Sequence, residues 1–415
     1  MRSPLHRLLA LLLALGLVAA ACGGSDEATE SEESTEESTD TEAEATDEAD
    51  ESEEAMDDMD DADDMEDMDG EMAAVDLSAV CPSTVVIQKD WNPESEHGAL
   101  YEMVGDDYEI DTDNFVVRGS LVAHGGVDTG VDIEVRSGGP AIGFQQVTAQ
   151  MYQDDSITFG YITTDEAVEN FNTLPTKAFV APLERNPQMI MWDPETYPDV
   201  TTIEELPDEA FVRYFGGASY IPYLLAEGIL VDGQLDDTYD GTPTIFVGEG
   251  GALAQQGFAS AEPFIYENEV PEWGKPVAYE LIHDTGYEVY AAAISVRAAE
   301  WDEMTPCMEA ITPVIQQAQV DFVTNPDATI ELILEAVEAY DNGWIYSEGV
   351  AYYSVDTMLA DGLVSNGPDA TLGNFDMDRV TSVVDLLTSN VFTDAEGVTP
   401  DDLVSNDFID ESIGL

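Results

Sequence analysis

The sequence predicts an α/β protein with two lobes and a helical C-terminal region. Over the first part of residues 77–415, short apolar runs alternate with helical segments, and this alternation is typical of a largely parallel sheet. The region has about 340 residues, which are too many for one ordinary core, so two lobes are expected. From about Ala298 onward, apolar residues recur every three or four positions, which indicates helices.

Five short segments have the strand signature, in which apolar residues are bounded by turn residues. They cover residues 84–88, 114–121, 133–135, 157–162 and 178–180. Four later segments have helical apolar spacing, with Gly, Pro or Asn at the breaks. They cover residues 300–323, 327–340, 348–361 and 376–388.

The chain begins with the features of a secretory signal peptide, which we assign to residues 1–21. Arg2 and Arg7 make a positive start, and an eleven-residue apolar run follows from position 8 to position 18. Because a membrane-spanning helix needs roughly 20 apolar residues, a transmembrane segment is the weaker interpretation.

The residues before Cys22 resemble a bacterial lipobox. Three alanines precede Cys22, although lipoboxes usually have Leu at the position of Ala19. The resemblance implies that the Cys22 thiol takes a diacylglycerol and that the signal is cut before it. The mature chain would then be lipid-anchored at the extracytoplasmic face of the cell membrane. Ordinary secretion, with Cys22 near the cut site, is the alternative.

Residues 22–76 are expected to comprise the lipidated cysteine and a disordered acidic tether. Positions 25–76 hold 27 Asp or Glu and no Lys or Arg. Such a segment repels itself and cannot bury a core, which favours an extended, solvated spacer. Metal binding is the alternative, because thioethers suit Cu(I) and carboxylates suit Ca²⁺. The thioethers of this pattern belong to Met56, Met59, Met65, Met68 and Met72.

The rest of the chain is also strongly acidic. Residues 77–415 hold 62 of the 89 acidic residues and 9 of the 11 Lys and Arg. This balance excludes nucleic acid as a partner, since phosphate binding needs clustered Lys and Arg. It also indicates surroundings of high salt, where screening makes the self-repulsion tolerable.

Three cysteines leave one pair once Cys22 is lipidated. In an exported protein, Cys81 and Cys307 are candidates for a disulfide that ties the start of the folded region to a late helix. Two buried free thiols are the alternative. The cysteine spacing has no zinc signature, and we expect no metal site.

Several motifs, taken in order, resemble the nitrate, sulfonate, taurine and thiamine-precursor family of periplasmic binding proteins. The first is the run from Asp90 to Tyr101, which includes Trp91-Asn92-Pro93 and His97. The others are Gly138-Gly139, residues 157–161, Thr-Thr-Ile-Glu-Glu-Leu at 201–206, residues 216–225 and residues 252–266. Two features depart from the family. The usual Gly-Lys does not follow Leu206, and the segments near the expected cleft have few basic residues, which disfavours an inorganic anion.

This resemblance implies a type 2 clamshell with two strands that cross between the lobes, near residues 176–187 and 275–297. Lobe 1 would comprise residues 77–180 and 285–415, and lobe 2 residues 181–284. The implied function is the substrate-binding component of an ABC importer, a monomer that closes on a small solute and delivers it to a permease and its ATPase. The solute would belong to the sulfonate, nitrate and taurine class or to the thiamine-precursor class, with a flat organic molecule favoured.

In such a fold, the ligand meets the carboxyl ends of strands and the starts of the helices that follow. Trp91 could stack on a flat ligand and His97 could bond its heteroatoms. Alternatively, Trp91 is buried against its lobe and His97 is a surface or capping residue. Gly138 and Gly139 would let backbone N–H groups approach a ligand, unless they only form a tight turn.

Further candidates follow later strands. Tyr161 and Thr163 end a strand and could supply hydroxyl groups. Gly217 and Ser219 precede a helix that could receive a carboxylate or sulfonate, although Ser219 could serve only as its N-cap. Glu262 would favour a ligand with an amine or ring N–H if it is buried beside the cleft. A carboxylate in solvent at a helix end is the alternative.

An enzyme and a sensor are the alternatives to an importer. A hydrolase would need a nucleophile elbow or a metal motif, but the sequence has no G-x-S-x-G, no H-E-x-x-H and no glycine-rich phosphate loop. We therefore expect no catalytic residue, no cofactor and no enzyme. The one enzymatic alternative is a relative that consumes a pyrimidine-type ligand. A lipoprotein that uses the same clamshell to sense a ligand is the other alternative.

Overall fold

A computed structural model describes residues 75–415 of the chain. The predicted signal peptide, the predicted lipidation site Cys22 and the predicted tether up to residue 74 lie outside the described residues. Within residues 75–415, no helix combines the length and the apolar character that crossing a membrane requires.

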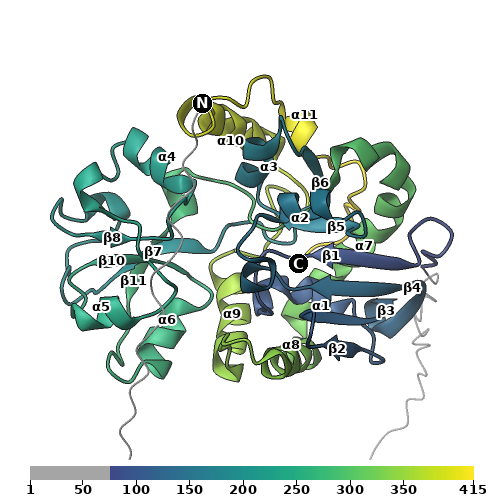
Figure 1. Ribbon diagram of the computed structural model, residues 1–415, viewed down its shortest axis with the longest axis horizontal. Helices are drawn as coiled ribbons and strands as arrows, with labels where there is room; N and C mark the ends of the chain where they lie inside the picture. Colours follow the sequence, from purple (N-terminus) through teal and green to yellow (C-terminus); the bar gives the residue numbers. More distant parts are fainter. Residues whose placement is uncertain (1–74) are drawn as a thin grey trace, which may run out of the picture. The chain divides into compact units, whose positions relative to one another are not determined.

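The first of two sheets has seven strands and lies on the right of Figure 1. In sheet order, the strands are β2 (Glu109–Asp111), β3 (Val116–Ala123), β4 (Val127–Arg136), β1 (Thr84–Gln88), β5 (Phe159–Ile162), β12 (Ala293–Arg297) and β6 (Thr176–Val180). The middle strand β1 pairs in parallel with both of its neighbours, β4 and β5. The carboxyl ends of these three strands therefore meet at one edge of the sheet.

The second sheet has five strands and lies on the left of Figure 1. In sheet order, the strands are β11 (Ala278–Leu281), β7 (Gln188–Trp192), β10 (Ala254–Phe258), β8 (Val212–Arg213) and β9 (Leu235–Asp236). Two of these strands are only two residues long, so their sequences carry almost no periodic signal.

The chain passes between the two sheets twice. It leaves the first sheet after β6 and reaches β7 through residues 181–187, and it returns from β11 to β12 through residues 282–292. Both crossings lie where the family resemblance implied them. We call the part built on the seven-stranded sheet lobe 1 and the part built on the five-stranded sheet lobe 2. The predicted two-lobed α/β fold is confirmed, and the residues at which one lobe gives way to the other stay a prediction.

The sheets are mixed, so the prediction of a largely parallel sheet is wrong. Strands β2, β3 and β4 form an antiparallel meander, and β12 is antiparallel to both β5 and β6. Only the short turn η2 (His124–Gly126) joins β3 to β4, and Gly125 and Gly126 adopt φ angles of 71° and 74° there. A connection this short permits antiparallel pairing only.

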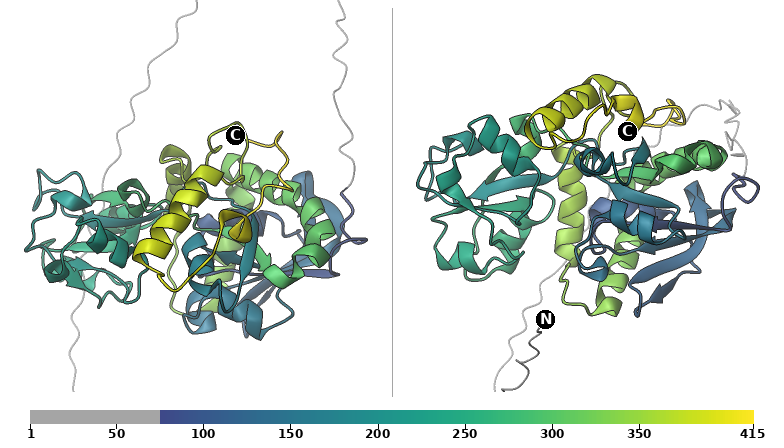
Figure 2. Two further views of the ribbon diagram at one scale, coloured as in Figure 1. Left: turned by 90° about the horizontal axis from the view of Figure 1, so that it is seen from above. Right: turned by 45° about the horizontal axis from the view of Figure 1, so that its top comes forward.

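Four long helices follow the second crossing, as the sequence predicted. They are α7 (Trp301–Thr324), α8 (Asp327–Tyr340), α9 (Glu348–Ala360) and α10 (Met377–Asn390). The bounds of α8 match the prediction, and those of the others differ from it by at most two residues. Helix α10 packs against α3 (Thr164–Asn170) of lobe 1 and α4 (Tyr220–Ala226) of lobe 2, and the right view of Figure 2 shows it above the junction of the lobes.

The remaining helices are short. The α-helices are α1 (Gly98–Glu102), α2 (Val147–Gln153), α5 (Thr244–Gly248), α6 (Glu262–Phe264) and α11 (Pro400–Leu403). The 3₁₀ turns besides η2 are η1 (Ser95–His97), η3 (Gly139–Ile142), η4 (Ile203–Glu205), η5 (Asp232–Gln234), η7 (Ile282–Thr285) and η8 (Ala298–Glu300). One π-helical turn, η6 (Ile265–Glu269), extends α6.

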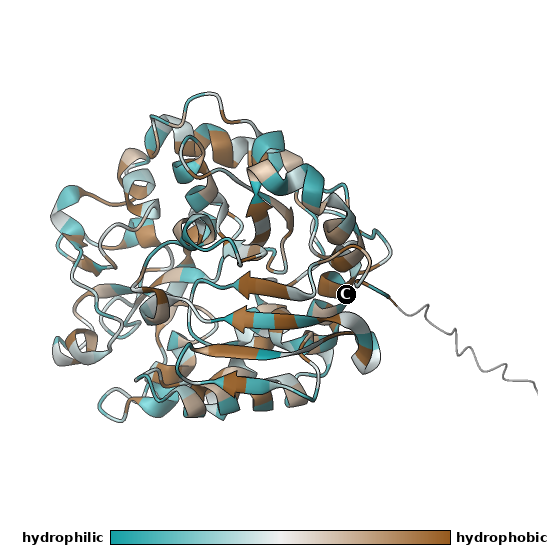
Figure 3. Ribbon diagram, turned by 45° about the vertical axis from the view of Figure 1, so that its right-hand side comes forward, coloured by the Kyte–Doolittle hydropathy of each residue, from teal (hydrophilic) through white to brown (hydrophobic). Residues whose placement is uncertain are grey.

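The core of lobe 1 is formed by its sheet and the helices that cover it. Ile87, Phe159 and Ile294 lie on neighbouring strands and are fully buried. Figure 3 shows several strands of the molecule as largely hydrophobic, which is typical of a sheet covered on both faces. Burying such side chains stabilises the fold by about 2 kcal/mol each, so the edge at which β1 ends is held rigidly.

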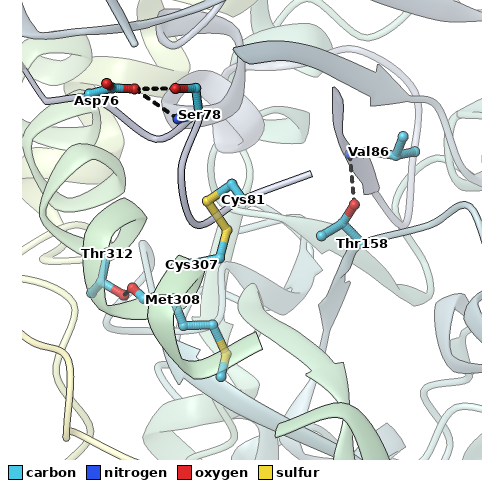
Figure 4. Close-up of a disulfide and its surroundings, with 8 residues drawn as sticks. All are labelled: Asp76, Ser78, Cys81, Val86, Thr158, Cys307, Met308 and Thr312. Atoms are coloured by element: carbon cyan, nitrogen blue, oxygen red, sulfur yellow. Dashed lines mark hydrogen bonds between the residues drawn. A yellow bond between two sulfur atoms is a disulfide. The ribbon is translucent and has the colours of Figure 1, made fainter. Parts of the chain in front are cut away.

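A disulfide joins Cys81 to Cys307 across a sequence separation of 226 residues, with the two Cα atoms 4.7 Å apart (Figure 4). Cys307 lies on α7, and Cys81 lies just before β1. The backbone N–H of Leu77 also donates to the carbonyl of Thr129 at 2.9 Å. The segment that precedes β1 is thus fastened to lobe 1 at two points.

Replacing both cysteines by alanine should lower the free energy of unfolding, because the cross-link closes a very long loop in the unfolded chain. The expected loss is about 3–5 kcal/mol. Guanidinium unfolding of the double variant and of oxidised and reduced wild type measures it. Reduced wild type is the matched control, since it keeps both side chains and lacks only the bond. Equal midpoints for oxidised and reduced wild type would contradict this account.

Candidate functional site

The candidate site starts where the apolar strand β1 gives way to a polar loop. Lys89 and Asp90 follow β1 directly, and the turn η1 ends at His97. Tyr161 lies near the carboxyl end of the neighbouring strand β5. Because β1 and β5 are parallel, the loop and the tyrosine meet at the same edge of the sheet, where ligands bind in folds of this class.

A small cavity of about 50 Å³ lies at this edge, between the lobes. Lobe 1 contributes Asp90, Glu94, Glu96, His97 and Tyr161 to its lining. Lobe 2 contributes Phe258, and the two crossings contribute Leu183, Pro187, Ala291 and Ala292. The lining therefore contains three carboxyl groups and no Lys or Arg, which makes the cavity acidic.

A larger cavity, of about 220 Å³, lies elsewhere in lobe 1, between α1, α7, α8 and η2. Two of its three carboxyl groups already have partners within the lobe. Asp321 lies 2.6 Å from His124 Nδ1, and Glu102 accepts a hydrogen bond from the hydroxyl of Thr329. Neither lobe 2 nor the crossings contribute to its lining, so closure of the lobes does not form it. The smaller cavity is the better candidate for a ligand site.

A chain of three polar groups supports the loop after β1. The Nζ atom of Lys89, a fully buried residue, lies 3.4 Å from His97 Nδ1, and His97 Nε2 lies 2.8 Å from Asp90 Oδ1. Burial lowers the pKa of Lys89 to about 7, and burial together with the Lys89 charge lowers the pKa of His97 to about 4. His97 is therefore neutral at pH 7. It donates from Nε2 to Asp90 and accepts at Nδ1 from Lys89.

Three glutamates gather around the cavity from both lobes. Glu96 accepts a hydrogen bond from Ser260 of lobe 2, and Glu262 Oε2 accepts one from the backbone N–H of Phe258 at 2.7 Å. The carboxyl group of Glu94 lies 3.7 Å from His97 Nδ1, which is too far for a hydrogen bond.

The surroundings of these glutamates favour their neutral forms. Burial raises the pKa of Glu94 well above its ordinary value, and the charge of Glu96 raises it further. Burial likewise raises the pKa of Glu96 and brings that of Glu262 to about 7, with a further contribution to Glu262 from the charge of Glu96. Carboxyl groups with raised pKa values that line a cleft are typical of functional sites.

The hydroxyl of Tyr161 is a buried polar group with no hydrogen-bond partner within residues 75–415. Tyr161 is 1% exposed, and its ring lies 5.5 Å from that of His97. Burial, together with the charge of Asp90, raises its pKa. An unpaired hydroxyl at a cavity wall costs free energy that a ligand can recover by bonding to it.

The two lobes are closed on each other through hydrogen bonds from hydroxyl groups to carboxyl groups. The donors and acceptors are Ser260 with Glu96, Ser219 with Asp165, Ser347 with Glu269, and Tyr279 with Asp361. Each pair joins one side chain of lobe 1 to one of lobe 2. Apolar contacts also join the lobes, as between the rings of Phe264 in lobe 2 and Tyr353 in lobe 1, whose centroids lie 5.4 Å apart.

Of the residues singled out from the sequence, His97 and Tyr161 line the cavity, and Glu262 contacts Phe258, which lines it. Trp91 does not line it. Its ring instead packs near Phe144 and Trp344, at centroid distances of 6.0 and 6.1 Å.

Gly138 and Gly139 support the loop with backbone N–H groups that are already bonded, to Trp91 O and Asp90 O. A Cβ at Gly138 would lie 2.3 Å from the backbone of Asp90. These glycines therefore let their backbone lie close to the backbone of the loop after β1. No N–H group of the pair is left for a ligand.

The other three candidates also lie outside the cavity lining. Thr163 caps α3 by accepting a hydrogen bond from the N–H of Glu166. Gly217 is exposed, with a φ of 90°. Ser219 precedes α4 but makes no side-chain cap, since its hydroxyl donates to Asp165 across the junction of the lobes.

Four residues of the cavity and its support, Lys89, Asp90, Glu94 and Glu96, were not singled out from the sequence. The sequence feature that could have indicated them is the high density of charged residues in this loop. Three carboxyl groups and a lysine crowd the first eight positions after an apolar strand, in a chain with 11 Lys and Arg. Among residues 75–415, no three His, Cys, Asp or Glu side chains are grouped so that they could hold a metal ion.

No protein-family model and no curated protein matches the chain. Solved structures do. A protein of Bordetella bronchiseptica RB50 aligns over 79% of this chain and 96% of its own, with 15% identity and a TM-score of 0.50. The periplasmic aliphatic sulphonate binding protein SsuA of Escherichia coli aligns over 76% and 92%, with 12% identity and a TM-score of 0.49. An ABC transporter structure from Parabacteroides distasonis aligns over 80% and 99%, with 12% identity and a TM-score of 0.45.

At these identities, the likeness concerns the fold. Together with the two sheets and the two crossings, the likeness to the Bordetella structure supports a two-lobed α/β fold for residues 75–415. The cavity lies where the lobes of that fold meet, at the carboxyl ends of β1 and β5.

Glu262→Gln should change how stability depends on pH. Because the pKa of Glu262 in the folded protein, about 7, exceeds its ordinary value of 4.5, the contribution of this carboxyl to stability is complete below pH 4.5 and is lost as the pH rises through 7. The melting temperature of the variant, relative to that of wild type, should therefore rise between pH 4.5 and pH 7 and stay constant above pH 7. Thermal melts from pH 4 to pH 8 measure this difference.

The exposed Glu209→Gln is the matched control, and its melting curve should run parallel to that of wild type throughout. If Glu262→Gln also runs parallel to wild type, Glu262 is not a buried carboxyl with a raised pKa.

Proposed function

We propose that this protein is the extracytoplasmic solute-binding component of an ABC importer, which captures a small organic solute between its lobes. The observation that carries the proposal is the acidic cavity at the carboxyl ends of β1 and β5, walled by both lobes and by both crossings. A ligand in that position contacts every part that moves when a clamshell closes. Its binding free energy can therefore favour the closed state.

Capture requires the lobes to part. A cavity of about 50 Å³ is far below the roughly 300–1,000 Å³ of typical small-molecule sites. Opening about the crossings would break the hydroxyl–carboxyl bonds between the lobes and expose Glu94 and Glu96. The solute enters in that state, and the lobes then close on it.

The proposed function also specifies the partners of the protein and its location in the cell. The closed clamshell presents both lobes to a membrane permease, whose ATPase supplies the energy for transport. The chain acts as a monomer and is held at the extracytoplasmic face of the cell membrane through a lipidated Cys22. It binds its solute and does not transform it. The resemblance suggests a solute of the sulfonate, nitrate and taurine class or of the thiamine-precursor class.

Native mass spectrometry of the purified full chain should show a co-purifying small molecule. Tyr161→Phe should weaken binding of that molecule about 2- to 13-fold, because it removes one hydrogen bond of roughly 0.5–1.5 kcal/mol. Calorimetric titration measures the change. Stability should not fall, since the hydroxyl bonds to no described residue of the protein and its burial without a partner costs free energy.

Tyr340→Phe is the control, because Tyr340 also has a buried hydroxyl but lies outside the cavity lining. If no small molecule co-purifies and no candidate solute binds, the solute-binding function is wrong. Equal affinities for wild type and Tyr161→Phe would instead move the site away from this cavity.

The lipid anchor has its own test. Cys22→Ser removes the thiol that lipidation needs, so the protein should be released to the medium or stay uncleaved in the membrane. Cell fractionation with mass analysis of the N-terminus distinguishes these outcomes from retention of a correctly cleaved chain. Such retention would show that Cys22 is not the anchor.

A further inference from the structure

The cavity between the lobes has carboxyl oxygens in excess of hydrogen-bond donors. His97 uses Oδ1 of Asp90, Ser260 uses Oε1 of Glu96, and the N–H of Phe258 uses Oε2 of Glu262. Within residues 75–415, the second oxygen of each of these carboxyl groups receives no side-chain donor. Glu94 has no hydrogen-bonded partner for either oxygen in the same part of the chain.

The positive groups nearby do not balance this charge inside the cavity. Lys89 lies beyond His97 and does not line the cavity, and His97 is neutral at pH 7. No Arg or Lys lies in the lining. An anionic solute would therefore lie beside the charge of Asp90 and would hold Glu94 and Glu96 in their neutral forms, whereas a cation favours the charged form of all three carboxyl groups.

A buried tyrosine hydroxyl completes the arrangement. Tyr161, 1% exposed, lines the cavity and has no partner within the described residues. It can accept a hydrogen bond from an N–H group or donate one to a solute acceptor. This observation is independent of the carboxyl groups and points to a bound molecule at the same place.

We propose that the solute carries a cationic amine, whose N–H groups bond to the free oxygens of Glu94 and Glu96 from lobe 1 and of Glu262 from lobe 2. The proposal rests on the proposed function, because it names the chemical class of solute for the same cavity. An ammonium group has three donors in a compact head. A cavity of about 50 Å³ has room for a group of that size.

The distribution of the carboxyl groups over the two lobes explains why such a solute would close the clamshell. Without a cation, closure brings Glu262 of lobe 2 near Glu94 and Glu96 of lobe 1, and these groups disfavour one another's charge. A cation between them turns this repulsion into attraction. Closure is then most favourable when the solute is present, as capture requires.

The test uses three probes with one skeleton, titrated by calorimetry into the purified full chain at pH 7.5. They are 2-phenylethylamine, which is cationic, 2-phenylethanesulfonate, which is anionic, and 2-phenylethanol, which is neutral. The amine should bind at least 10-fold more tightly than the other two. Its affinity should fall at least 10-fold at pH 5, where Glu94, Glu96 and Glu262, whose pKa values are raised, take up protons while the amine stays charged.

Glu262→Gln and Glu94→Gln should each weaken amine binding at least 10-fold at pH 7.5, and Glu209→Gln should leave it unchanged. The second of these variants keeps the test decisive if the first does not fold. Tighter binding of the sulfonate or the alcohol, no binding of any probe, or an amine affinity indifferent to both variants would overturn the cationic class. The co-purifying molecule decides the proposed function separately, since an anionic solute found there would refute the amine and leave solute binding intact.

Discussion

The burial of carboxyl groups between the lobes is the constraint around which the rest of the site is arranged. Desolvating a carboxylate costs several kcal/mol unless donors or charges compensate. The protein compensates in part, with Ser260 for Glu96, a backbone N–H for Glu262 and His97 for Asp90. The carboxyl oxygens that receive no side-chain donor lie around one small cavity. In the closed state, a bound ligand can supply the missing donors.

One of the chain's few cations, Arg379, holds the two crossings together. Arg379 of α10 bonds to Glu184 at 3.0 Å and to the carbonyls of Glu288 and Val289, and it lies 3.7 Å from the ring centre of Tyr290. These partners belong to the two crossings or lie at their ends. In a chain with 89 acidic residues, placing an arginine there stabilises the segments about which the lobes turn.

Local periodicity made part of this fold predictable. The strand Thr84–Gln88 and the helix Asp327–Tyr340 have the predicted bounds, because each is an unbroken run of the expected pattern. Strands β8 and β9 have two residues each and exist only through their pairing in lobe 2. No local signal of the sequence could show them.

The residues of the site also divide into those that a local pattern indicates and those that only the fold brings together. His97 and Tyr161 could be found because they follow strands, where ligands bind in α/β folds. The gathering of Glu94, Glu96 and Glu262 could not, since it depends on how two lobes close over residues far apart in the chain. Ser219 shows that the position of a residue in the sequence does not determine its contacts. It precedes a helix, as a capping residue does, but its hydroxyl donates to Asp165 in the other lobe.

The disulfide between Cys81 and Cys307 also determines how mechanical force enters the protein. Tension from the chain that precedes residue 75 would reach the disulfide before it reached β1, and Cys307 would pass it to α7, within lobe 1. The crossings and lobe 2 lie outside that path. A pull on this end of the described chain would therefore be borne by lobe 1, and lobe 2 would carry none of it.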